Sequence, residues 1–154
     1  MDFACFSAPE HCSNDFSRYF YLNLLLSAPS ASDYVKDMAS TGILTAILPE
    51  MSSLKDCLQN KHHPDNAYEH SFNALSCLED VFNDSSNFPD DIKKGLQQII
   101  PSRNHSLLKF AILIHDVGKP HTRTVDDAGN VHFYSHEKKS AELSDIITKR
   151  LRFS

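Results

Sequence analysis

Histidine is frequent in this chain of 154 residues, which contains nine histidines, four cysteines and no tryptophan. Imidazole is the commonest neutral ligand for transition metals, although most single histidines in proteins are surface or core residues. The cysteines form no C-x-x-C pair, so a thiolate zinc site is not expected and the thiols are predicted to be reduced. The positions of the histidines relative to carboxylates must therefore identify any metal site.

The pair His115 and Asp116 ends a segment, residues 106–117, that is apolar nearly throughout. A polar pair in a buried helix is costly unless something satisfies it. A divalent cation would do so, because nitrogen and oxygen ligands both suit such ions and the carboxyl end of a helix attracts positive charge. The alternative is local: Asp116 forms a cap or salt bridge, and His115 bonds a backbone carbonyl.

Three further residues could complete a site around this pair. His70 lies in the first turns of an amphipathic helix, and two antiparallel helices would bring it against His115. Lys119 follows the helix end, where its ammonium could meet a phosphate oxygen, or could only complement the helix dipole. His136 lies in the first turn of the last helix, whose free backbone donors favour anions, or is simply an exposed residue near a cap.

The elements that must position these residues are predicted to be helical, because apolar residues recur at three- and four-residue spacing. The predicted helices cover about residues 13–27, 32–42, 43–48, 51–59, 66–82, 90–101, 106–117 and 136–153. Residues 123–125 could pair with 131–133 around a turn at 126–130. The expected fold class is all-α, a helical bundle with at most one small β-hairpin near 123–133.

The composition of the sequence bears on the cellular location of the protein and on its binding of nucleic acid. No apolar run approaches the roughly 20 residues of a membrane helix, and the amino terminus lacks the features of a signal peptide, so we expect no membrane association and a cytoplasmic location. The formal net charge is −5, with acidic and basic residues interspersed. Binding of nucleic acid chiefly by bulk electrostatics is therefore not expected, and any RNA contact would have to be local.

Several short motifs occur together in a defined order. They are Gly-Ile-Leu at 42–44, Leu-Pro-Glu at 48–50, His-His-Pro-Asp at 62–65, Glu-His at 69–70, His-Asp-Val-Gly-Lys-Pro at 115–120, Phe-Tyr-Ser-His at 133–136, Ser-Ala at 140–141 and Arg-Leu-Arg-Phe-Ser at 150–154. Over about residues 16–154 the chain resembles the HD-domain metal-dependent phosphohydrolases. More specifically, it resembles the HD region of bacterial tRNA nucleotidyltransferases and poly(A) polymerase-type proteins.

This resemblance implies a metal site and a reaction. His70, His115 and Asp116 would bind a divalent ion, such as nickel, manganese, cobalt, magnesium or iron. The reaction would be hydrolysis of a phosphoester, including 2′,3′-cyclic phosphates and nucleotides. In members of the superfamily with two metals, Asp116 would bridge the ions and His136 would join the second.

The resemblance also suggests roles for residues beside the ligands. Lys119 would offset the charge of the phosphate, as general phosphoryl chemistry requires. Glu69 could orient a water molecule, although a solvated helix carboxylate is the plainer interpretation. His62 and His63 would shape the entry to the His70 helix, with direct ligation by His63 as a further alternative. The implied partners are a nucleotide or RNA-end phosphoester, tRNA, or a nucleotidyltransferase head domain.

The sequence departs from the family pattern in two ways. It has no region that matches the nucleotidyltransferase head, so we do not expect nucleotide addition by this chain alone. It also ends at Ser154, before the helices that supply the family's last Asp and a further His, and Asp145 lies mid-helix without the family context. The expected organisation is a helical lead-in over residues 1–58 and an HD-type domain over 59–154 that is truncated at its carboxyl-terminal side.

Three hypotheses about function follow from these observations. The first is a metal-dependent phosphohydrolase that uses His70, His115 and Asp116. The second is a catalytically inactive HD fragment that acts as an interaction module in tRNA processing. The third is a homo-oligomer that completes its core or its ligand set across a subunit interface.

Overall fold

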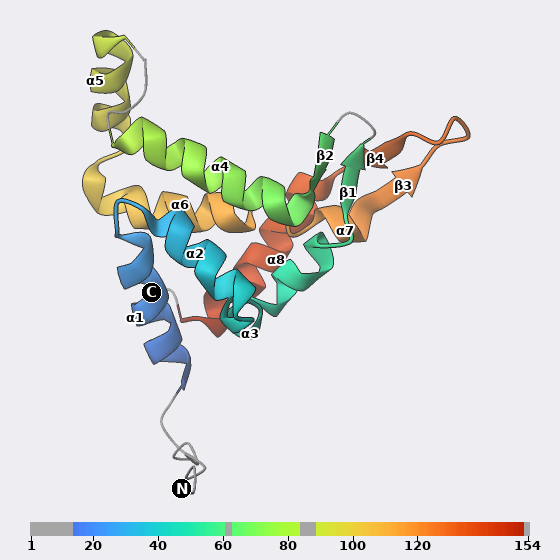
Figure 1. The fold of residues 1–154 in the computed structure, drawn as a ribbon, viewed down its shortest axis with the longest axis horizontal. Coiled ribbons are helices and arrows are strands. Elements are labelled where there is room, and N and C mark those ends of the chain that lie inside the picture. Colours follow the sequence, from blue (N-terminus) through green and yellow to red (C-terminus); the bar gives the residue numbers. More distant parts are fainter. Residues whose placement is uncertain (1–13, 61–62, 84–88, 153–154) are drawn as a thin grey trace, which may run out of the picture.

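Helices make up most of the described chain, which comprises residues 14–60, 63–83 and 89–152 of a computed structural model. The helices are α1 (Asn14–Leu26), α2 (Ala31–Ser40), α3 (Ile43–Ile47), α4 (Ala67–Phe82), α5 (Asp90–Ile99), α6 (His105–Ile114), α7 (Lys119–Thr122) and α8 (His136–Arg150), with 3-10 turns η1 (Pro49–Leu54) and η2 (Ser102–Asn104) (Figure 1). The strands are β1 (Leu58–Asn60), β2 (His63–Asn66), β3 (Arg123–Val125) and β4 (Val131–Phe133). The predicted all-α class is confirmed.

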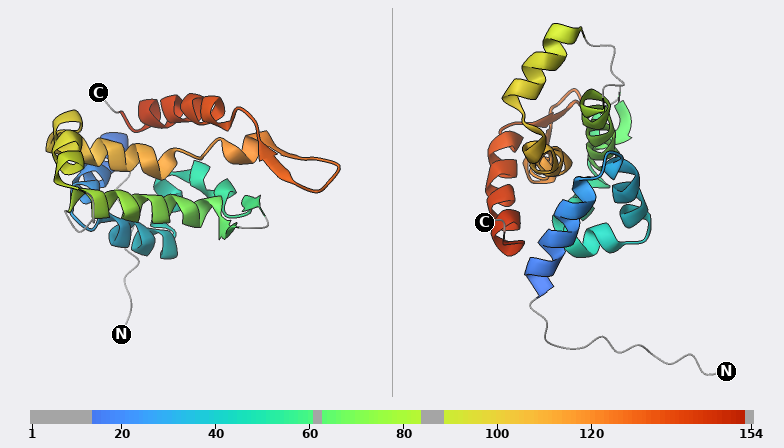
Figure 2. Two further views of the ribbon diagram at one scale, coloured as in Figure 1. Left: turned by 90° about the horizontal axis from the view of Figure 1, so that it is seen from above. Right: turned by 90° about the vertical axis from the view of Figure 1, so that its left-hand side faces the viewer.

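Helix α6 is the centre of the fold. It lies between α4 and α8 (Figure 2), and α1 also packs against it. The buried cluster includes Leu22 and Leu26 of α1, Val35 of α2, Leu44 of α3, Met51 and Leu54 of η1, Phe72 and Leu75 of α4, Phe110 and Leu113 of α6, Ile147 of α8, and Leu151. Each fully buried side chain of this size contributes about 1.5–3 kcal/mol. Residues from both sides of position 58 therefore share one core.

Helix α4 begins where the sequence predicts. Asn66 is the N-cap residue in an extended conformation, and its side chain accepts a hydrogen bond from the backbone N–H of Glu69 at 2.9 Å. Such a cap satisfies one of the free donors of the first turn. The apolar side of the helix then buries Phe72 and Leu75 against the core, which fixes its rotation. His70 is placed as a consequence of this start and this rotation.

The predicted hairpin is confirmed with the same strand limits. Strands β3 and β4 are antiparallel, with Arg123 opposite Phe133 and Val125 opposite Val131. The turn contains Gly129 at φ 79°, a left-handed conformation that costs glycine little. The hairpin projects from the helical body and joins α7 to α8 (Figure 1).

The structure also contains elements that the sequence did not predict. Residues 58–60 form β1, which pairs with β2, so the expectation of at most one hairpin misses this second pair. A helix was predicted over 51–59, but the helical part ends at Leu54, and the Cys57 carbonyl accepts from the Ala67 N–H at 2.9 Å. The sequence does not predict these strands, because their extended conformation comes from pairing with each other and their composition does not indicate it.

Helix α8 begins at the predicted position, but its N-cap residue does not have the predicted capping geometry. Ser135 stands at the predicted N-cap, yet it adopts the left-handed conformation at φ 61° and its side chain makes no capping bond.

Residues 119–122 form the short helix α7, for which the sequence predicts no element. Residues 1–13, the start of the predicted helical lead-in, and His62 lie outside the described residues. Within the part of the chain that is described, none of the helices has the length and apolar character needed to cross a membrane.

Candidate functional site

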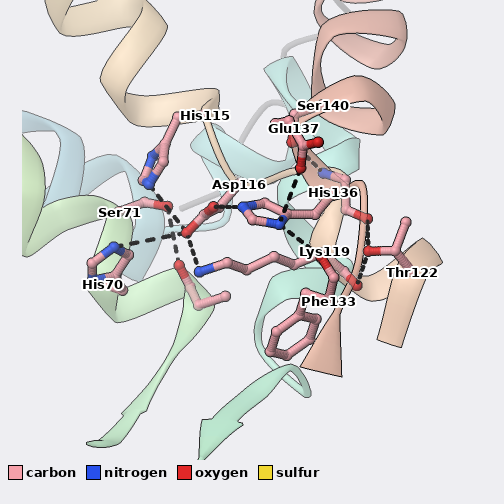
Figure 3. Close-up of polar contacts among 12 residues, drawn as sticks. His70, Ser71, His115, Asp116, Lys119, Thr122, Phe133, His136, Glu137 and Ser140 are labelled. Atoms are coloured by element: carbon pink, nitrogen blue, oxygen red, sulfur yellow. Dashed lines mark hydrogen bonds and ion pairs between the residues drawn. The ribbon is translucent and has the colours of Figure 1, made fainter. Parts of the chain in front are cut away.

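Asp116 is the centre of a cluster at the carboxyl end of α6 (Figure 3). Its side chain is only 2% exposed. The Oδ2 atom lies 2.7 Å from Lys119 Nζ, 3.1 Å from His115 Nε2 and 3.7 Å from His70 Nε2. The Oδ1 atom lies 3.7 Å from His136 Nε2. The fold therefore brings four of the residues singled out in the sequence around the carboxylate of a fifth, Asp116.

Two of the histidines are oriented by backbone carbonyls. Nδ1 of His115 lies 2.7 Å from the Ile112 carbonyl oxygen, and Nδ1 of His136 lies 2.8 Å from that of Phe133. Because a carbonyl oxygen can only accept, each Nδ1 must carry the hydrogen and donate it. Each ring then directs Nε2 toward Asp116. This arrangement is typical of metal-binding histidines, whose second nitrogen is held by the protein.

The charges around Asp116 keep the carboxyl ionised. Burial by itself raises the pKa of Asp116, but contacts with His115 and Lys119 outweigh burial and lower that pKa from 3.8 to about 2. The adjacent carboxylate in turn raises the pKa of His115, against the opposing effect of burial. A buried carboxylate of this kind offers negative charge to a cation at neutral pH.

The donor set fits a divalent metal. His70, His115 and Asp116 each offer one ligand atom, and these atoms all lie within 4.8 Å of one another. Although Lys119 and His115 are close, Oδ2 of Asp116 receives no well-directed hydrogen bond from the described residues. A buried oxygen without such a bond is expensive unless an ion or water satisfies it. Nitrogen and oxygen donors together suit borderline divalent ions.

A close contact between the turn after α6 and α8 holds the two halves of the cluster together. The N–H of Gly118 donates to Ser140 Oγ at 3.0 Å. A Cβ at Gly118 would collide with the Ser140 backbone nitrogen and would lie 2.5 Å from the His136 carbonyl oxygen. Only glycine allows this approach, so the backbone of α8 can lie directly on the turn that carries Asp116.

Other candidate residues lie away from the cluster. Glu69 is exposed and lines a depression with Lys36 and Lys55 on another side of α4. Asp145 is on the exposed side of α8, where its Oδ2 pairs with Lys149 Nζ at 2.6 Å. The backbone of His63 lies in β2, and its side chain is outside the described part of the structure.

Sequence reasoning gave no role to two residues that shape the site. The Phe133 ring lies 5.7 Å from Lys119 Nζ, and Ser140 supplies the hydrogen bond to the Gly118 turn. Ser140 follows His136 by four residues, a spacing that places two side chains on one face of a helix. That spacing could have linked Ser140 to the site.

Comparison with known proteins agrees with this geometry. A sequence model of the HD domain family matches residues 67–153, which is more than half of the chain. The chain is 30% identical over 134 residues to the A-adding tRNA nucleotidyltransferase of Deinococcus radiodurans, covering 85% of this chain and 26% of that protein. It is 29% identical over 130 residues to the CC-adding tRNA nucleotidyltransferase of Thermus thermophilus, covering 84% of this chain and 26% of that protein.

The chain therefore spans about a quarter of the length of these two curated relatives. The matched region of the family contains α4, α6 and α8, the helices that carry or immediately precede the clustered residues. His70, His115, Asp116 and His136, which the motifs had singled out, all lie within the matched region. This chain belongs to the HD domain family.

Proposed function

We propose that this chain is a divalent-metal-dependent phosphohydrolase of the HD type, with His70, His115 and Asp116 as metal ligands. The observation that carries the proposal is the convergence of the His70 and His115 rings on the buried Asp116 carboxylate, with one ligand atom from each of the three residues within 4.8 Å of the others. The identity of the ion remains open among nickel, manganese, cobalt, magnesium and iron.

The proposed reaction is hydrolysis of a phosphoester. Water adds across an ester P–O bond: its oxygen bonds to phosphorus, the ester bond breaks, and the leaving oxygen takes up a proton. A bound divalent ion would supply Lewis acidity toward a phosphoryl oxygen and lower the pKa of water. Lys119 would contribute a fixed positive charge to a phosphate oxygen, because its partly buried ammonium already lies at the edge of the donor set.

His136 is proposed as a ligand on the other side of Asp116. Oδ2 faces His70 and His115, whereas Oδ1 faces His136. A carboxylate whose two oxygens face different histidines has the geometry that a bridging ligand between two ions needs. A role for Glu69 in orienting water stays a prediction.

The names of the two curated relatives support a proposal for the substrate and the partners of this chain. Both are named as tRNA nucleotidyltransferases, and the similarity covers 26% of each. We therefore propose a nucleotide or an RNA-end phosphoester as the substrate, with tRNA or a nucleotidyltransferase head domain as a partner. The cytoplasmic location and the formation of a homo-oligomer stay predictions.

A second candidate function is an interaction module without catalysis. Lys119 Nζ lies 2.7 Å from Asp116 Oδ2, so an internal cation already balances the buried carboxylate. If this ion pair replaces a metal, the HD region would serve only to bind RNA or another domain. The experiment below separates the two candidates.

The test measures metal content and turnover together. We expect purified protein to contain a divalent metal of the proposed series, to hydrolyse adenosine 2′,3′-cyclic phosphate with at least one ion of that series, and to unfold at a higher temperature when that ion is added, because ligand binding stabilises the folded state. His115→Ala and Asp116→Asn should lose all three properties. Asp145→Asn, an exposed carboxylate on α8, should retain them.

Two outcomes would count against the phosphohydrolase. Unchanged metal content and turnover in both His115→Ala and Asp116→Asn would show that the ligands are wrong. Absence of metal and of turnover across the whole ion series in the unaltered protein would favour the interaction module.

A further inference from the structure

A cavity lies where α4 ends and α6 begins, away from the Asp116 cluster (Figure 1). Its volume is about 310 Å³, at the lower end of the range for small-molecule sites. The lining comes from the loop after α1, the end of α4, the turn η2 and the start of α6, and consists of Ser27, Pro29, Phe82, Asn83, Ser102, Arg103, His105, Ser106 and Lys109. His105 begins α6 and His115 follows its last residue, about 15 Å further along the helix axis. The cavity is therefore separate from the candidate metal site.

The ionisable side chains that line this cavity are all basic. They are Arg103, His105 and Lys109, and no aspartate or glutamate of the described residues lines it. Glu79 balances the charge of Lys109, with Oε1 2.7 Å from Nζ. The net positive charge of the cavity therefore comes from Arg103, which is exposed and forms no ion pair with any described residue, and from His105 when its ring is protonated. Such a lining favours an anionic ligand.

The buried member of the lining, Lys109, has one hydrogen-bond donor to spare. Its residue is only 4% exposed. An ammonium carries three hydrogens, and this one donates to the Ala28 carbonyl at 2.6 Å and to Glu79 at 2.7 Å. The third hydrogen has no acceptor in the part of the chain that the structure describes. We expect an oxygen of a bound ligand to accept it.

The ring of His105 is held in a fixed plane by stacking. Its centroid lies 3.7 Å from that of Phe82, and the two rings are inclined by only 5°. Phe82 ends α4 and His105 begins α6, so the stack joins two of the segments that line the cavity. Neither ring nitrogen of His105 bonds to another described residue. A donor that is already oriented loses little conformational entropy when it binds a ligand.

The chemistry of these donors favours a phosphate over other anions. A guanidinium can form two parallel bonds to a phosphate, and a terminal phosphate offers three acceptor oxygens to the guanidinium, imidazole and ammonium together. Because Lys109 is buried, a ligand oxygen must enter the cavity to reach it. A free phosphate or one at the end of a small molecule can do so, whereas a phosphate within an RNA strand is substituted on both sides.

We propose that this cavity binds a terminal phosphate, either free or on a small molecule, through Arg103, His105 and Lys109. The site is independent of the proposed hydrolysis at Asp116, because it lies at the opposite end of α6. A phosphate held there would contact the loop after α1, the end of α4 and the start of α6 at once. Its binding would therefore stabilise the packing of these helices.

The affinity for inorganic phosphate tests the proposal by isothermal titration calorimetry. Lys119→Met serves as the background, because it removes the cation that could hold phosphate at the Asp116 cluster. Adding Arg103→Gln should weaken binding about 10-fold, the loss that one charge-assisted hydrogen bond corresponds to. Arg103→Lys keeps the charge and should bind more tightly than Arg103→Gln. The same titrations with glycerol 3-phosphate distinguish a free phosphate from a phosphorylated molecule by their relative affinities.

Two further measurements locate the bound phosphate. In the unaltered protein, backbone amide NMR shifts of residues 102–106 should move as phosphate is added. Lys36→Gln is the control for charge, because Lys36 is an exposed lysine that lines the depression beside Glu69, and it should retain the full affinity.

Three outcomes would overturn the phosphate site. The first is Arg103→Gln that binds phosphate as tightly as its background, and the second is amide shifts of residues 102–106 that do not respond. The third is single-stranded oligouridylate whose binding weakens in Arg103→Gln while phosphate binding does not, because Arg103 would then contact an RNA strand. Loss of phosphate affinity in Lys36→Gln, with Arg103→Gln unaffected, would place the anion in the other depression and would contradict the proposal equally.

Discussion

At the scale of single residues, the site depends on how Asp116 is surrounded. A carboxylate that is almost fully buried must be balanced by charge or by hydrogen bonds. Here Lys119 and His115 contact Oδ2, and His136 lies nearest to Oδ1. The two oxygens therefore have different neighbours. Among these contacts, Lys119 is the residue that supplies a permanent positive charge to the Asp116 carboxylate.

Replacement of Lys119 by methionine tests this charge. Lys119→Met keeps a long unbranched side chain, removes the charge and should leave metal content intact, because the donor set of His70, His115 and Asp116 is unchanged. The kcat/KM for a phosphoester should fall about 100-fold, the size of effect seen when one group that stabilises a transition-state charge is removed. Steady-state kinetics and elemental analysis measure the two quantities.

Lys139→Met is the matched control, because Lys139 is part of an exposed pair with Glu142 on α8. It should leave both quantities unchanged. A Lys119→Met protein with the full kcat/KM would show that the ammonium serves only as a counter-ion for Asp116.

At the scale of elements, the site depends on the contact between the turn after α6 and helix α8. Three of the clustered residues lie in or next to this turn, and His136 is delivered by α8. The Gly118 N–H donates to the side-chain oxygen of Ser140, and the backbone of α8 lies so close to Gly118 that a Cβ there would collide with it. A small change at Gly118 should therefore affect one side of the cluster selectively.

Gly118→Ala tests this coupling. The added Cβ would collide with the Ser140 backbone and lie 2.8 Å from its Oγ, so the turn and α8 must separate. We expect urea unfolding to show a loss of about 1–3 kcal/mol, as for other overpacked positions. Turnover should fall as well, because His136 moves away from Asp116.

Gly95→Ala provides an internal comparison on α5, where a Cβ would meet nothing within 4 Å. This variant should gain about 0.5–1 kcal/mol, since alanine favours a helix interior over glycine. Equal stability of Gly118→Ala and the unaltered protein would mean that the turn can adjust without cost.

At the scale of the whole molecule, a buried ion pair connects three helices. Glu79 of α4 accepts from the backbone N–H groups of Ala31 and Ser32 at the start of α2, at 2.6 and 3.0 Å. Its Oε1 also lies 2.7 Å from Lys109 Nζ of α6, and both side chains are 5% exposed. Burial opposes ionisation of Glu79, but the bonds from Lys109 and Ser32 outweigh it and hold the pKa below its ordinary value.

Glu79→Gln should therefore destabilise the entire fold. Loss of one partner leaves a buried ammonium uncompensated, which costs about 3–5 kcal/mol. Because the pKa of Glu79 is lowered on folding, the stability that it contributes is present above its unfolded pKa, about 4.3, and is lost as the pH falls below that value. Urea unfolding at a series of pH values should show the gap between the two proteins narrow below about pH 4.

Glu142→Gln, which alters only an exposed pair with Lys139, should unfold like the unaltered protein at each pH. A gap between Glu79→Gln and the unaltered protein that does not depend on pH would show that the shape of the side chain matters and its charge does not.

Local signals in the sequence were sufficient to predict the helical class, the start of α4 and the limits of the β3–β4 hairpin. These features depend on local signals: apolar spacing, an Asn66 cap and turn residues around Gly129. It also singled out His70 and the His115–Asp116 pair, because a polar pair at the end of an apolar helix is conspicuous without any knowledge of the fold. The β1–β2 pair carried no comparable local signal.

Only the tertiary structure decided which of the candidate residues meet. His136 reaches Asp116 because α8 lies directly on the Gly118 turn, a contact across 22 positions of the chain, whereas Lys119 reaches Asp116 locally, three residues along the same turn. Glu69 adjoins His70 in sequence but faces a different depression, since neighbouring residues on a helix point about 100° apart. Long-range packing decides which helix face meets the turn after α6, and no local pattern encodes that choice.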